Sequence, residues 1–198
     1  MRSMLPVAGI DLGPVARTRA DCFADDVVAE ARSVGVDPGL LFVDTHRIIT
    51  AAGDLHVVAT ISGAGAQEWQ LWRMCSAVVR RHGALACTVG RHSVGDGHAL
   101  VATRAAIDER LLRIAGRCVH FPGVESLVGT MTVGQIVEAS AIEHVTEIGA
   151  PALDVTAEIL TGGHVRPRWE FGTLTLHVQH EGQRLYRPFE VAPAAASH

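Results

Sequence analysis

The stretch "LLFVDTHRIITAAGDLHVVATISG", residues 40–63, decides the fold. It contains two runs rich in β-branched residues, separated by a turn signal at Gly53-Asp54. This pattern predicts two strands joined as a hairpin. Because the two strands of a hairpin run antiparallel, the sheet around this segment is expected to be antiparallel.

Helices are predicted on both sides of this hairpin. In "RTRADCFADDVVAEARSV", residues 17–34, apolar residues recur from Phe23 to Ala31 at the spacing of an amphipathic helix. In "AQEWQLWRMCSAVVRRHG", residues 66–83, the apolar side follows the same period and Gly83 supplies a stop signal. The hairpin is therefore expected to pack against helices.

The middle of the chain is predicted to add a second hairpin and a short helix. The hairpin is expected over "ALACTVGRHSVGDGHALVATR", residues 84–104, with its turn at "GDG", and the helix over "AAIDERLLRIAG", residues 105–116. "MTVGQIVEASAIEHVTEIG", residues 131–149, is predicted as a further helix. Strands over "WEFGTLTLHVQ" and "RLYRPFEV", joined by a turn at "HEGQ", close the chain.

Hairpins interleaved with helices, without a regular β-α-β alternation, predict the α+β class, with helices packed on a single antiparallel sheet. The length of 198 residues fits one domain, taken here as residues 1–198. Residues 1–15 and 192–198 are expected to be loose.

Composition excludes several classes of function. The net charge of −4 argues against a nucleic-acid partner, which requires clustered positive charge. No apolar run approaches the roughly 20 residues of a membrane span, and the first residues lack the apolar core of a signal peptide, so a cytoplasmic protein without a membrane partner is expected. The four cysteines form no CxxC pair, which favours buried free thiols over disulfides.

Arg91 is a candidate functional residue because it extends the apolar row of Leu85, Cys87 and Val89 on a predicted strand. A guanidinium facing the core would need a carboxylate from the protein or from a ligand. The alternative is that the strand has already reached solvent at Arg91.

Other signals from the residues alone are weaker. Arg104 and Glu190 lie near predicted strand ends, where exposure is the plain alternative. The eleven histidines show no HxxxH spacing and no fixed acidic partner, so no metal is predicted. GxSxG, GxxxxGK[ST] and GxGxxG motifs are all missing from the sequence, so these residues by themselves name no reaction.

Four strings occur in an order that resembles the chorismate lyase family, which includes the 4-hydroxybenzoate synthases and the UTRA-like ligand-binding domains of GntR-type regulators. They are "LLFVDTHRIIT", "GDGHALVATRAAID", "TVGQIVEASAIEHVTEIG" and "LTLHVQHEGQRLYRPFEVAP". The resemblance implies a chorismate-lyase-like fold and a reaction without cofactors, in which pyruvate is eliminated from chorismate to give a hydroxybenzoate. The enzyme would hold a reactive conformer and stabilise shifting negative charge.

The resemblance also implies a set of site residues. The amides of Val133 and Gly134, at the start of a helix, would meet the ligand, with a further amide from Thr45-His46. Arg91 would bind the ring carboxylate.

The same resemblance places Arg104 among the substrate-binding residues and Glu190 at the opposite end of the ring. The registers of two strands stay open. The family's arginine aligns with Val89 unless a two-residue shift brings in Arg91, and its glutamate aligns with Phe189 unless a bulge brings in Glu190.

Three functions remain open from the sequence. The first is a lyase acting on chorismate or a related cyclic or aromatic carboxylate. The second is a non-catalytic domain that binds or senses an aromatic acid. The third is a related elimination, cyclisation or isomerisation enzyme of secondary metabolism. All three predict a small-molecule carboxylate as the ligand, and none predicts an oligomeric state.

Overall fold

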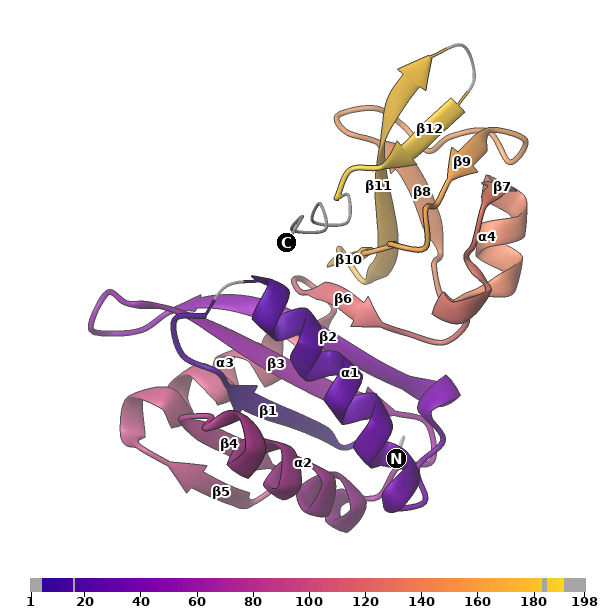
Figure 1. Ribbon diagram of the computed structural model, residues 1–198. Coiled ribbons are helices and arrows are strands. Elements are labelled where there is room, and N and C mark those ends of the chain that lie inside the picture. Colours follow the sequence, from indigo (N-terminus) through magenta and orange to yellow (C-terminus); the bar gives the residue numbers. More distant parts are fainter. Residues whose placement is uncertain (1–4, 16, 183–184, 191–198) are drawn as a thin grey trace, which may run out of the picture.

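The computed structural model describes residues 5–15, 17–182 and 185–190 (Figure 1). Its strands form one sheet in the order β5-β4-β1-β3-β2-β6-β10-β11-β12-β9-β7, and β8 pairs with β11. The pairs among these described strands are antiparallel except β8 with β11 and β9 with β12. The protein is therefore α+β with one large, mostly antiparallel sheet, as the sequence predicts at this coarse level.

The first six strands and α-helices follow the order βαββαβ. They are β1 (Val7–Asp11), α1 (Arg17–Ser33), β2 (Leu41–Ile49), β3 (Leu55–Gly63), α2 (Glu68–His82) and β4 (Ala86–Val89). Their strands lie in the order β4-β1-β3-β2, so this part has the ferredoxin-like arrangement of two interleaved β-α-β units. The predicted hairpin of β2 and β3 and the predicted helices α1 and α2 are confirmed.

The helices cover both faces of this part of the sheet. Side chains of α1 and α2 pack with Ala8 and Ile10 of β1 in one core. Helix α3 (Gly97–Leu112) packs on the other face, where Ala102 and Ala106 contact Val58. Figure 1 shows α1 and α2 on the near side of the strands and α3 behind them.

The expectation that residues 1–15 are loose is wrong for the described part. All five residues of β1 are buried, and the strand pairs with both β3 and β4. A strand covered on both faces shows no alternation of polar and apolar residues, so the short run "VAGID" carries no periodic signal. Residues 192–198, also expected to be loose, lie outside the described part of the chain.

The predicted second hairpin is misplaced. Strand β4 turns at Gly90-Arg91 into β5 (His92–Gly95), and the residues after that belong to α3. Asp96 caps the helix by accepting a hydrogen bond from the amide of Ala99 at 3.0 Å. The aspartate that the sequence pattern places in a hairpin turn is thus a helix N-cap.

The predicted helix over residues 131–149 is also only partly right. Helix α4 (Val133–Ala139) is capped by Thr132, whose side chain accepts a hydrogen bond from the amide of Gln135. It stops at Ser140, and the chain continues into β8 (His144–Glu147), which pairs with β11. Tertiary pairing with β11 therefore overrides the helical pattern of the second half.

The C-terminal strands and the two 3₁₀ turns complete the fold. They are η1 (Pro38–Leu40), β6 (Arg117–His120), η2 (Val124–Ser126), β7 (Thr130–Thr132), β9 (Glu158–Leu160), β10 (Arg168–Glu170), β11 (Thr173–Gly182) and β12 (Leu185–Pro188). The predicted closing hairpin is confirmed as β11 and β12, with an irregularity between His180 and Gly182.

A second hydrophobic core lies among these C-terminal strands and α4, and it includes Phe121, Ile136 and Trp169. Strand β6 links the two cores, because Val119 belongs to the first and Cys118 to the second. The single sheet therefore contributes strands to both hydrophobic cores. The assignment of residues 1–198 to one domain stays a prediction.

Candidate functional site

A cavity of about 610 Å³ lies at the open edge of β2. Within the described residues, strand β6 pairs with β2 only from Val43 to Thr45, and the following residues of β2 pair with β3 alone. Gly116, at φ +123°, turns the chain away from this edge. The volume falls within the range of about 300–1,000 Å³ that is typical of small-molecule sites.

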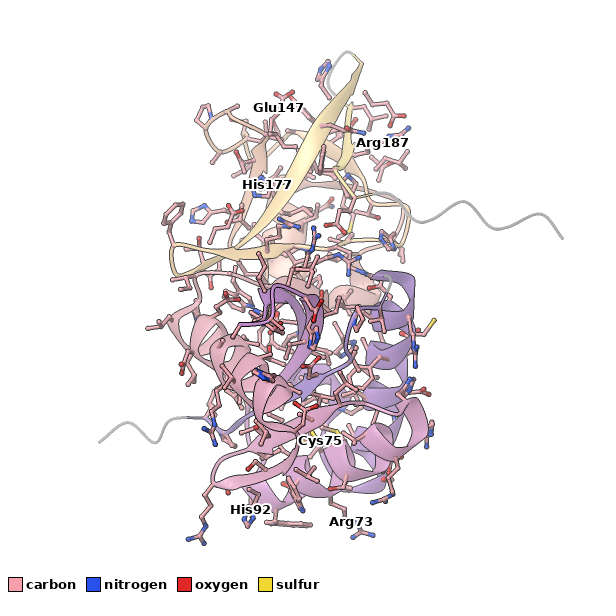
Figure 2. The ribbon with its side chains drawn as sticks, turned by 90° about the vertical axis from the view of Figure 1, so that its left-hand side faces the viewer. Arg73, Cys75, His92, Glu147, His177 and Arg187 are labelled. Carbon is pink, nitrogen blue, oxygen red and sulfur yellow. The ribbon has the colours of Figure 1, made fainter. Side chains whose placement is uncertain are left out.

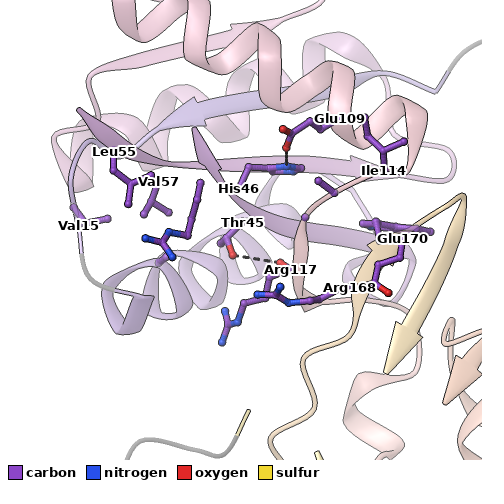
Figure 3. Close-up of a pocket in the computed structure, with 15 residues that line it drawn as sticks. Val15, Thr45, His46, Leu55, Val57, Glu109, Ile114, Arg117, Arg168 and Glu170 are labelled. Carbon is purple, nitrogen blue, oxygen red and sulfur yellow. Dashed lines mark hydrogen bonds and ion pairs between the residues drawn. The ribbon is translucent and has the colours of Figure 1, made fainter. Parts of the chain in front are cut away.

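One side of the cavity combines apolar walls with an arginine (Figure 3). Thr45 and Arg47 are two residues apart on β2 and therefore share a face, and Val57 of β3 is the register partner of Arg47. Val15 and Leu55 extend the apolar wall. Arg47 is exposed and has no acidic partner among the residues that the structure describes.

The other side of the cavity holds a histidine and a glutamate. His46 Nδ1 lies 2.8 Å from Glu109 Oε2, and His46 Nε2 lies 3.0 Å from Thr60 Oγ1. Since a carboxylate only accepts, His46 Nδ1 donates to Glu109.

This hydroxyl, imidazole and carboxylate have the connectivity of a nucleophilic triad. Thr60 is 0% exposed, however, so its hydroxyl cannot reach a substrate. His46 is also buried, whereas the Glu109 side chain is 31% exposed. Glu109 is therefore the accessible member of this group.

Asp44, two residues before His46 on β2, forms a buried ion pair with Arg110. Asp44 is fully buried and accepts a hydrogen bond from Trp169 Nε1 at 2.9 Å. Arg110 Nε lies 2.8 Å from Asp44 Oδ2, although its N–H is not aligned for a hydrogen bond. The Arg110 guanidinium stacks 4.5 Å from the Trp169 ring centroid, so charge pairing and a cation–π contact fix it together.

Arg117 joins three separate parts of the chain beside the cavity. Its Nη1 and Nη2 donate to the two oxygens of Asp21 on α1, at 2.6 and 3.1 Å, and its Nε donates to Glu190 after β12. Burial acts to lower the pKa of Arg117, but the hydrogen bonds to Asp21 and Glu190 outweigh it and raise the pKa.

The pKa of Asp21 shifts in the opposite direction. Burial acts to raise its pKa, but the hydrogen bonds and positive charge of Arg117 lower the pKa below its ordinary value. Arg168, which also lines the cavity, lies 3.6 Å from Glu190. Arg117 and Arg168 are thus already opposed by carboxylates of the protein.

The structure brings some of the expected site residues together. Thr45 and His46 are among the residues that line the cavity, and their role in ligand contact stays a prediction. Glu190 is hydrogen-bonded to Arg117 beside the cavity, and it lines a second, smaller hollow that Arg168 also lines.

Arg91 does not belong to this site. The strand ends at Val89, so Arg91 falls on the exposed turn between β4 and β5. Figure 2 shows the neighbouring His92 at the opposite end of the molecule from His177 of β11. The expectation of an inward-facing Arg91 is wrong, and the plain alternative of an exposed strand end holds.

Arg104 and the start of α4 also fail to form a site. Arg104 is exposed on α3. The amide of Val133 donates to the Ala157 carbonyl at 3.0 Å, and that of Gly134 donates to the Val155 carbonyl at 2.9 Å. Since both amides already donate to backbone carbonyls of the protein, they are not free to bind a ligand.

Sequence reasoning missed all five charged residues that line the cavity, which are Arg47, Glu109, Arg117, Arg168 and Glu170. The one local signal is the alternation that puts Arg47 on the face of Thr45. Their convergence depends on four elements that are separate in sequence, namely β2, α3, β6 and β10.

The described residues include no group of three or more histidine, cysteine, aspartate or glutamate side chains that could hold a metal ion. All four cysteines are free, and three are buried while Cys22 is exposed. Burial, followed by the neighbouring Asp44, raises the pKa of the Cys118 thiol well above its ordinary value. This thiol is therefore a poor nucleophile.

The comparisons with known proteins identify no relative, since no family model, curated protein or solved structure matches the chain. Among the described residues, no helix has the length and apolar character needed to cross a membrane.

Proposed function

We propose that the protein binds a small organic carboxylate in the cavity at the open edge of β2. The observation that carries this proposal is the position of Arg47. Among the three arginines that line the cavity, Arg117 and Arg168 face carboxylates of the protein, whereas Arg47 has no acidic partner within the described residues.

The surroundings of Arg47 favour an anion with an apolar body. Val15, Leu55 and Val57 offer apolar surface beside the guanidinium, and Thr45 adds a hydroxyl on the same face. A charged hydrogen bond between Arg47 and a carboxylate would contribute about 1.5–3 kcal/mol. Burial of the apolar body would add to this, so a carboxylic acid with an aromatic or aliphatic body fits better than an inorganic anion.

Binding without turnover is the first choice, and elimination of pyruvate from chorismate is the second candidate. Glu109 favours the second, because it is a partly exposed carboxylate on the cavity wall that could accept a proton. The chorismate lyase relationship itself stays a prediction. Neither Arg91 nor the α4 amides support that reaction, so Glu109 would have to take a role that the resemblance does not assign.

The test uses calorimetric titration with benzoate and 4-hydroxybenzoate, with Arg47→Gln compared against Arg91→Gln. Both arginines are exposed, so both variants are expected to fold. Arg47→Gln should weaken binding at least about tenfold, whereas Arg91→Gln should leave it within about twofold.

Absence of binding at millimolar acid, or equal effects of the two substitutions, would reject the proposal. Pyruvate detection after incubation with chorismate separates the two candidates. If pyruvate is released and Glu109→Gln abolishes this release, the protein is the lyase. If chorismate binds but no pyruvate is released, the protein is a binding domain.

A further inference from the structure

The edge of β2 that faces away from β3 is unpaired beside the cavity. Strand β6 covers this edge only from Val43 to Thr45, and within the described residues the stretch from Arg47 to Ile49 pairs with β3 alone. Arg47 also lines the cavity, and Ile49 is 73% exposed. The backbone groups of an unpaired strand edge can pair with an added strand, so this edge is a possible binding surface.

The alternation of an antiparallel ladder decides which backbone groups point to the open side. In such a ladder, directly opposite residues exchange hydrogen bonds only at every second pair. The amide of Thr50 donates to the Asp54 carbonyl at 2.9 Å, and these two residues continue the register of β2 with β3. Two residues earlier, Ile48 therefore bonds to β3, and the N–H and C=O groups of Arg47 and Ile49 point to the open side.

Arg47 thus presents both its backbone and its side chain beside the cavity. Its guanidinium is exposed and has no acidic partner within the described residues. Its backbone carbonyl accepts a hydrogen bond, and its guanidinium donates. A ligand that meets both groups needs a carboxylate and, close to it, an N–H donor. The last residue of a peptide has both.

The apolar wall of the cavity lies on the matching face of the sheet. Val57 is the register partner of Arg47, and residues directly opposite each other have their side chains on the same face. Leu55, two residues from Val57, shares this face, and Val15 adds to the same wall (Figure 3). A ligand residue paired with Arg47 across the open edge would place its own side chain on this face. An apolar side chain is therefore expected there.

We infer that the cavity receives the C-terminal end of a peptide, which adds a short strand to the open edge of β2. The last residue lies opposite Arg47, where its amide N–H donates to the Arg47 carbonyl and its carboxylate accepts from the guanidinium. A parallel peptide would place its earlier residues beside Thr45, where β6 already pairs, so the peptide runs antiparallel to β2. The third residue from its end then lies opposite Ile49. The ligand class is a peptide with an apolar last residue and a free carboxylate, and this assignment rests on the proposed function.

The first test compares three acids with the same apolar side chain by calorimetric titration. They are N-acetylleucine, its ester analogue in which oxygen replaces the amide N–H, and 4-methylpentanoate, which has neither group. N-acetylleucine should bind at least about threefold more tightly than the other two, because it alone donates to the Arg47 carbonyl. The other two should still bind, and Arg47→Gln should weaken the binding of all three.

The second test extends the ligand along the strand edge. N-acetylated alanyl-alanyl-leucine should bind at least about threefold more tightly than N-acetylleucine, because it reaches the backbone of Ile49. Ile49→Pro removes the N–H at this position and should abolish the gain, whereas Ile49→Val keeps the N–H and should retain the gain. N-acetylleucine does not reach Ile49, so its unchanged binding shows that each variant is folded.

Equal affinity of N-acetylleucine and its ester analogue, or no gain from the longer peptide, would overturn the inference. A gain that persists in folded Ile49→Pro would overturn it too, and if this variant does not fold, the comparison of ligands on the unaltered protein decides. In each of these cases, binding of 4-methylpentanoate that depends on Arg47 leaves the proposed function standing. If none of the acids binds at millimolar concentration, the proposed function is overturned as well.

Discussion

Replacement of Arg110 by methionine should destabilise the protein strongly, because it leaves Asp44 charged and buried. Asp44 is fully buried, and its remaining contacts are the hydrogen bond from Trp169 at 2.9 Å and a long one from Thr60 at 3.5 Å. Removing one partner of a buried ion pair costs about 3–5 kcal/mol. For a chain of this size about 1 kcal/mol corresponds to about 2–4 °C, so the melting temperature should fall by about 6–20 °C.

The assay is urea unfolding followed by circular dichroism, with the free energy of unfolding taken from the midpoint and slope. Arg104→Met, an exposed substitution on the same helix, is the matched control and should change stability by less than about 0.5 kcal/mol. The double variant Asp44→Asn/Arg110→Met should recover part of the loss, since asparagine carries no charge and still accepts from Trp169. A loss below about 1 kcal/mol for Arg110→Met, or a double variant less stable than that single variant, would refute the reasoning.

Three further predictions concern other parts of the molecule. Because the pKa of Asp21 is lowered in the folded state, its stabilising contribution is present above the ordinary aspartate pKa and is lost as the pH falls through the folded-state value. Asp21→Asn should therefore flatten the fall in stability below about pH 5, measured by urea titrations at several pH values. Gly116 has φ +123°, and the Cβ added by Gly116→Ala would lie 2.8 Å from the ring of His46. This substitution should lower the free energy of unfolding by about 1–3 kcal/mol in the same assay. An unchanged free energy of unfolding would contradict the tight approach of the backbone to the ring. Native protein should react rapidly with a thiol reagent at Cys22 alone, and unfolded protein at all four cysteines, as counted by mass spectrometry; fast native labelling of a buried thiol would contradict the burial.

Local patterns in the sequence determined the helices α1 and α2 and the hairpin of β2 and β3. The periodicity from Phe23 to Ala31 and the stop at Gly83 are properties of short segments, so they can be interpreted without knowledge of the rest of the chain. The α+β class follows from these segments and from the closing hairpin. The sequence also predicts Thr45 and His46 near a ligand, but only through a resemblance that no comparison supports.

Only the tertiary structure decided which residues meet at the cavity. Strand β1 is covered on both faces by helices, which removes the alternation that would reveal a strand. Arg91 lies in solvent because β4 ends two residues earlier, whereas Arg117 is buried because α1 and the end of β12 bring carboxylates to it. The local conformation of a segment depends on its neighbours in the chain, but the burial and charge pairing of a side chain depend on elements distant in sequence.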